Sequence, residues 1–91
     1  MSKPHVSAAA VQARLTEALT PIELEVRDDS AAHAGHAGAR EGSHLSVRIV
    51  SDRFTGLTRL ARHRLVYDSL STLMPQGIHA LTIDARAPGE P

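Results

Sequence analysis

The chain has 91 residues, with ten basic and ten acidic side chains, and contains no cysteine. That length fits one small domain with a modest core and leaves no room for a second domain. The balanced charge argues against a general attraction to nucleic acid or anionic membranes, and without cysteine this chain can supply neither a disulfide nor a thiolate ligand.

The N-terminal part predicts a helix followed by a strand. Residues 1–6 read as a loose end, after which Ser7 can cap a helix whose apolar residues recur at helical spacing up to Thr20. Pro21 stops that helix because it restricts the residue before it. Apolar and charged residues then alternate over 22–27, which predicts a half-buried strand. The side chains expected to point inward from this strand are Ile22, Leu24 and Val26.

Residues 28–43, with the sequence DDSAAHAGHAGAREGS, have no apolar periodicity and are rich in alanine, glycine and histidine. A structureless connection of this length is uncommon in a compact domain and is usually functional or mobile. A second alternating strand follows over 45–50. Because no helix intervenes between the two strands, we expect them to pair antiparallel.

The C-terminal half predicts helix and then strand. Between residues 57 and 74 the apolar stripe shifts from one helix face to another. This shift favours a short helical turn that leads into a longer, redirected helix ending at Pro75 and Gly77. A third strand begins at Ile78 and should lie parallel to the second, because a helical crossover connects them.

The order α-β-β-α-α-β predicts a single α+β domain spanning residues 7–86. We expect a three-stranded mixed sheet with its helices on one face, a polar opposite face, and a disordered tail over residues 87–91. The residues expected on the polar face are Glu23, Glu25, Arg27, Ser46, Arg48, Thr82 and Asp84. Because neither a signal peptide nor an apolar run long enough to span a bilayer is visible, we expect a cytoplasmic protein without membrane contact.

The common catalytic and nucleotide-binding motifs are missing from the sequence. It has no phosphate-binding glycine loop, no G-x-S-x-G nucleophile turn and no H-E-x-x-H zinc motif. The adjacent Asp28 and Asp29 read as turn residues rather than as an acid–base pair. We therefore expect no enzymatic activity.

Six histidines are the unusual feature of the composition, since histidine supplies metal ligands and proton chemistry near neutral pH. His33 and His36 have a weak metal-site spacing, and the plainer interpretation is a solvated loop. His79 opens the third strand in phase with its inward residues, where the plainer interpretation is packing at the rim of the core. His63 lies on the apolar helix stripe as a structural residue, and His44 starts the second strand.

Basic residues bracket the second strand and the start of the helix, namely Arg48, Arg53, Arg59, Arg62 and Arg64. They form either a solvated face or a patch for a partner that presents carboxylates or phosphates. We expect the helix to be anchored to the sheet by Leu65, Val66, Tyr67 and Leu70. Arg62 and Arg64 would then face outward, and replacing Arg64 with alanine should weaken partner binding without unfolding the domain.

Three segments together resemble the signature of the BolA family. They are VSDRF-x-G over residues 50–56, RHRLVY-x-x-L over 62–70 and IHAL over 78–81. Ser43-His44 and the loop opening at Asp28 also fit the pattern, and the resemblance covers about residues 7–86. It implies a fold similar to type II KH domains, with the element order that the periodicity also predicts.

The resemblance also implies a partner and a cofactor. BolA proteins bind monothiol glutaredoxins of the CGFS type, and the heterodimer can hold a [2Fe–2S] cluster between the two proteins. The BolA partner supplies the histidine of the IHAL motif, here His79. A second ligand comes from the first inter-strand loop, here His33 or His36, with His44 as a third candidate. Partner contacts are expected at Phe54, Gly56, Arg59, Arg62 and Arg64, and the family's C-terminal extension is largely missing from this chain.

The chemistry of the donors agrees with a shared cluster. A partner cysteine and the thiol of glutathione would supply sulfur to one iron, and neutral imidazoles from this chain would bind the other. We expect no metal on the isolated chain, which should be a monomer or a weak dimer, since two imidazoles on a loop and a strand edge are a poor cage for iron.

Two functions follow from these arguments. The favoured one is a non-enzymatic adaptor in iron–sulfur cluster trafficking or in iron and redox sensing. The alternative is a DNA-binding transcriptional regulator of stress response and cell morphology that uses the KH-like surface. The zero net charge, the missing GXXG loop and the scarcity of aromatic side chains for stacking count against the alternative.

Overall fold

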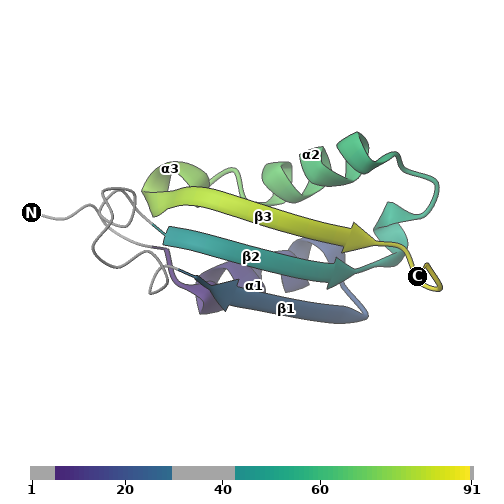
Figure 1. Ribbon diagram of the computed structural model, residues 1–91, viewed down its shortest axis with the longest axis horizontal. Helices are drawn as coiled ribbons and strands as arrows, with labels where there is room; N and C mark the ends of the chain where they lie inside the picture. Colours follow the sequence, from purple (N-terminus) through teal and green to yellow (C-terminus); the bar gives the residue numbers. More distant parts are fainter. Residues whose placement is uncertain (1–5, 30–42, 91) are drawn as a thin grey trace, which may run out of the picture.

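The structure is a computed structural model, and it describes residues 6–29 and 43–90. Its elements in chain order are α1 (Ala8–Leu19), β1 (Glu23–Asp28), β2 (Ser43–Val50), a 3-10 turn (Asp52–Phe54), α2 (Arg59–Ser69), α3 (Met74–Gly77) and β3 (Ile78–Arg86). The strands form one sheet in the order β1-β2-β3, and the helices cover one of its faces (Figure 1). This arrangement confirms the predicted α+β domain with a mixed sheet. None of the helices in the two described ranges has the length and apolar content to cross a membrane.

Helix α1 forms where the apolar spacing predicts it. Ser7 Oγ accepts a hydrogen bond from the backbone N–H of Ala10 at 3.1 Å and so caps the first turn. The buried residues of the helix recur at every fourth position and are Val11, Leu15 and Leu19. Thr20 ends the helix in the left-handed region, with φ of 40°, and its N–H bonds back to the carbonyl of Thr16.

The sheet has one buried and one polar face. β1 and β2 pair antiparallel, and β2 and β3 pair parallel, as predicted. In β2 the buried side chains are Leu45, Val47 and Ile49, and the side chains between them are Ser46 and Arg48. The prediction that Ile22 points inward is wrong: Ile22 is 61% exposed, because it lies before β1, where the chain turns from α1 into the sheet.

The two C-terminal helices have the opposite order of lengths from the prediction. The longer helix, α2, comes first, and α3 is a single turn next to the start of β3. Pro75 lies in the first turn of α3 rather than at the end of a helix, where its missing N–H leaves no helical hydrogen bond unmade.

The core between the helices and the sheet bears on two further assignments. Phe54, Val66 and Leu70 have no exposed surface, so Val66 and Leu70 anchor α2 as predicted. Tyr67 is 40% exposed, and its anchoring role remains a prediction. Phe54 fills the core and has no exposed surface for the partner contact predicted for its side chain.

Candidate functional site

The IHAL motif begins β3 at the edge of the sheet where β1 ends and β2 begins (Figure 1). In the parallel register Ser43 lies opposite Ile78, and His44 lies opposite Ala80. The backbone of His79 therefore occupies an irregularity between two paired positions. On the other side of β2, Asp28 of β1 pairs with Leu45. The backbone of the IHAL motif therefore begins at the same end of the sheet as the two strand ends that flank residues 30–42.

The irregularity interrupts the predicted alternation at the start of β3. Strict alternation would place residue 79 in phase with Leu81 and Ile83, and Ile78 out of phase. Ile78 is nevertheless buried, with 7% exposure, so the alternation slips by one residue at this point. Bulges of this kind redirect side chains and recur beside functional sites. His79 is placed here by its backbone register, while His33 and His36 lie outside the described residues.

Asp29, the residue that precedes the segment 30–42, is held to β2 by hydrogen bonds. The backbone N–H of Asp29 donates to the carbonyl of His44 at 2.7 Å, which extends the antiparallel pairing one residue beyond β1. The Asp29 carboxylate accepts a hydrogen bond from Ser46 Oγ and pairs with Arg27 Nε at 3.3 Å. These contacts fix Asp29 against β2.

The expected partner contacts lie toward the other end of the sheet. Phe54 and Gly56 follow the end of β2, and Arg59 and Arg62 belong to the first turn of α2. Arg62 contacts Ala85 near the end of β3, six residues from His79, which corresponds to about 20 Å of strand. The structure therefore divides the predicted site residues that it describes into two groups, and Arg62 does not reach the end of the sheet where the IHAL motif begins.

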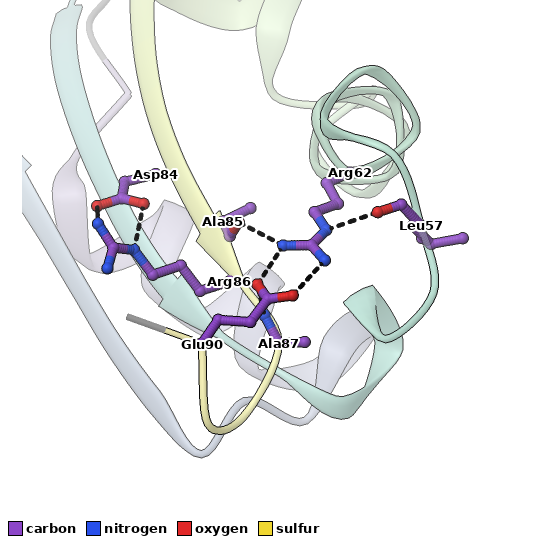
Figure 2. Close-up of polar contacts among 7 residues, drawn as sticks. All are labelled: Leu57, Arg62, Asp84, Ala85, Arg86, Ala87 and Glu90. Atoms are coloured by element: carbon purple, nitrogen blue, oxygen red, sulfur yellow. Dashed lines mark hydrogen bonds and ion pairs between the residues drawn. The ribbon is translucent and has the colours of Figure 1, made fainter.

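Arg62 is held inside the molecule rather than facing outward as predicted. Its side chain is 14% exposed. Nε donates to the carbonyl of Leu57 at 3.0 Å, and one terminal nitrogen donates to the carbonyl of Ala85 at 3.3 Å. The two terminal nitrogens bind both carboxylate oxygens of Glu90, at 2.5 and 2.8 Å (Figure 2).

Within the described residues, Glu90 lies on a hydrogen-bonded turn that follows β3, and the disordered tail expected over residues 87–91 stays a prediction. The backbone N–H of Ala87 donates to Glu90 Oε1 at 2.9 Å, and Ala87 is 5% exposed. The hydrogen bonds from Arg62 and from Ala87 lower the pKa of Glu90 to about 2. No local sequence pattern predicts the Arg62–Glu90 pair, because 28 residues separate its members.

A groove of about 650 Å³ opens beside the Arg62–Glu90 pair, between α2 and β3. Its polar lining comes from Arg59, Arg62, His63, Asp84 and Arg86. Arg86 donates to both carboxylate oxygens of Asp84, at 2.9 and 3.3 Å, and this contact holds the pKa of Asp84 below its ordinary value (Figure 2). Sequence reasoning missed Asp84 and Arg86 as members of a site, because each belongs to the alternating polar face of the sheet.

Arg64 is the exposed arginine of the RHR motif. It lines a shallow hollow of about 360 Å³ on α2, together with Leu60, which is 60% exposed. Its predicted contact with a partner remains a prediction, as does the contact of Arg59. His63 is half-buried on the other side of α2, against the groove, which suits the structural role predicted for it.

Comparison with known proteins agrees on one family. A family model described as BolA-like protein matches residues 15–90. BolA-like protein 1 of Mus musculus is 44% identical over 82 residues, which cover 90% of this chain and 58% of the mouse protein. The DNA-binding transcriptional regulator BolA of Escherichia coli is 41% identical over 73 residues, which cover 80% of this chain and 68% of the regulator.

A solved structure extends this agreement to the fold. The BolA domain of SufE1 from Arabidopsis thaliana superposes with a TM-score of 0.81 at 44% identity, over 92% of this chain and 94% of the domain. The chain spans 23% of the whole SufE-like protein 1, a chloroplastic or mitochondrial protein by its name, and little more than half of the mouse relative.

Proposed function

The chain belongs to the BolA-like protein family, and from this premise we propose that it is a non-enzymatic adaptor for a monothiol glutaredoxin. The adaptor shares a [2Fe–2S] cluster with that partner, in cluster trafficking or in iron and redox sensing. One observation carries the proposal. The backbone of the IHAL motif starts β3 at the end of the sheet where β1 ends and β2 begins, and these two strand ends flank residues 30–42, the sequence segment that contains His33 and His36.

The donors of this chain suit a shared cluster. The chain has six histidines and no cysteine, so sulfur for the cluster must come from the glutaredoxin and from glutathione. His79 and one of His33 and His36 would hold one iron through neutral imidazole nitrogens. When bound, such a cluster provides one-electron chemistry and an iron–sulfur unit that can be transferred.

Two features of the fold would orient these ligands. The strand irregularity at His79 redirects the chain at the start of β3. Hydrogen bonds to His44 and Ser46 of β2 hold Asp29, which directly precedes the segment that carries the loop histidines. One ligand therefore comes from a strand and the other from a connection whose first end is fixed, which suits a site that releases its cluster to a recipient.

The test is visible absorption and circular dichroism of this protein mixed with a cluster-loaded monothiol glutaredoxin and glutathione. We expect the spectrum of the mixture to differ from that of the glutaredoxin alone. The difference should vanish with His79→Ala and with one of His33→Ala and His36→Ala. It should also weaken as the pH falls toward ~6.5 and below, because a ligating imidazole must be deprotonated.

His63→Ala is the matched control, because it also removes one imidazole but acts at the groove beside Arg62, away from the IHAL edge. It should leave the mixed spectrum unchanged, and His44→Ala tests the third candidate ligand. A spectrum of the mixture identical to that of the glutaredoxin alone would remove the cluster role.

The second candidate function is DNA binding, favoured by the name of the Escherichia coli relative. Binding that uses a phosphate-tracking surface loses affinity steeply as salt rises. Titration of a DNA duplex at several salt concentrations therefore separates the two candidates. A shallow salt dependence, or no binding, would leave the adaptor role alone, and a cytoplasmic location remains a prediction under either function.

A further inference from the structure

The guanidinium of Arg62 is a rigid and nearly buried binding site for one carboxylate. Its side chain is 14% exposed, and the carbonyls of Leu57 and Ala85 hold it from two different elements. These two contacts leave an edge of the planar group with parallel N–H donors directed at Glu90 (Figure 2). Because the receptor is fixed before its ligand arrives, little side-chain freedom remains to be lost on binding.

The carboxylate that occupies this site is less firmly held than the receptor. Glu90 is 39% exposed and lies on the turn that follows β3. Besides Arg62, its carboxylate has one other hydrogen bond in the described part of the chain, from the backbone N–H of Ala87. An exchange of ligands at Arg62 therefore requires movement of the turn and leaves α2 and β3 in place.

The surroundings of the pair favour a second anion. The groove beside it holds the guanidinium groups of Arg59 and Arg86 and the half-buried His63, against one carboxylate, that of Asp84. Asp84 pairs with Arg86 by a two-point contact and interacts with Arg59 only at longer range, so Arg59 is the guanidinium of this lining that can attract an incoming acidic group. An acidic segment with neighbouring carboxylates could place one on the Arg62 fork and another near Arg59.

We propose that the groove between α2 and β3 is a binding site for the side-chain carboxylates of an acidic peptide segment, and that Glu90 occupies its Arg62 subsite when no partner is bound. The planar two-point contact with Glu90 selects carboxylate geometry. The site lies about 20 Å along β3 from His79, so it neither uses nor depends on the cluster ligands.

The test uses an acetylated and amidated hexaglutamate peptide as the probe, titrated at low salt into the full chain labelled with ¹⁵N. Glu90→Gln removes the competing carboxylate and should tighten peptide binding at least tenfold, the factor expected when Glu90 occupies the subsite at least nine tenths of the time. The Nε–H resonance of Arg62 should shift on binding, because Nε belongs to the same guanidinium as the two terminal nitrogens that form the fork.

Two controls make the result specific. Glu17→Gln changes the net charge equally but removes a carboxylate that is 77% exposed and pairs with Arg14, so it should not tighten binding. Adding Arg62→Lys to Glu90→Gln keeps the charge and removes the fork, and should return the affinity to that of Glu17→Gln.

Equal affinities for Glu90→Gln and Glu17→Gln would overturn the proposal, and so would an Arg62→Lys change without effect. Competition by inorganic phosphate as strong as that by free glutamate would overturn the carboxylate assignment. If Glu90→Gln proves unfolded by circular dichroism, the wild-type chain still decides the question. A saturating concentration of the peptide must then shift the side-chain carboxyl ¹³C resonance of Glu90, and an unchanged resonance refutes the exchange.

Discussion

Replacing Ser51 with alanine should destabilise the fold far more than the size of a hydroxyl suggests. Ser51 is 1% exposed, and its Oγ donates to the carbonyl of Leu19 at 2.8 Å. The same oxygen accepts from the N–H of Arg53 at 3.1 Å and so caps the 3-10 turn. One hydroxyl therefore joins the end of α1, the end of β2 and the start of that turn.

The magnitude follows from what the substitution leaves behind. The carbonyl of Leu19 belongs to the last turn of α1, where carbonyls have no intrahelical partner, and an orphaned buried acceptor costs about 1–3 kcal/mol. The lost cap costs about 1 kcal/mol more. We expect Ser51→Ala to lower the free energy of unfolding by about 2–4 kcal/mol, a large share of the roughly 5–14 kcal/mol typical of a chain of this length.

Urea unfolding followed by far-UV circular dichroism measures this loss, with Ser7→Ala as the matched control. Ser7 makes a cap hydrogen bond of similar length, 3.1 Å, but does so in contact with solvent, so water can replace its oxygen. Its loss should cost about 0.5–1 kcal/mol. If the two variants unfold at the same urea concentration with equal slopes, the argument from burial is refuted.

Two further predictions concern the end of α1 and the C-terminal turn. Thr20 has a φ of 40°, a conformation that is strained for a β-branched residue, so Thr20→Gly should raise the free energy of unfolding by about 0.5–1 kcal/mol. Thr16→Gly, inside the helix, should lower it; a loss of stability in both variants would contradict the strain. The pKa of Glu90 is about 2 in the folded chain against an ordinary 4.5, so the pair stabilises the fold above pH 4.5 and this contribution disappears as the pH falls toward 2. A ¹³C titration of the Glu90 carboxyl should show this midpoint, and Arg62→Gln should move it toward 4.5; a midpoint near 4.5 in the wild-type chain would exclude the ion pair in solution.

The candidate site was predictable where it depends on a contiguous motif. The IHAL segment and the two loop histidines stand out in the sequence. The direction in which the strands pair follows from the helix-free connection between the first two and the helical crossover between the last two. The Arg62–Glu90 pair was not predictable, because its members are 28 residues apart and neither lies in a periodic pattern that involves the other. The same motif reasoning directed Arg62 outward and Phe54 to a partner, since a motif identifies a residue without saying which way its side chain points.

Local patterns of the sequence alone determine most of the architecture. The spacing of Val11, Leu15 and Leu19 specifies α1, and the alternation around Val47 specifies the central strand, because a helix and a strand bury one face at periods of 3.6 and 2 residues. Periodicity fails where an element ends or two elements meet. Tertiary structure decided three features: the exposure of Ile22, the register irregularity at the start of β3 and the inward position of Arg62. Each depends on which backbone or side chain from a distant part of the sequence packs beside it.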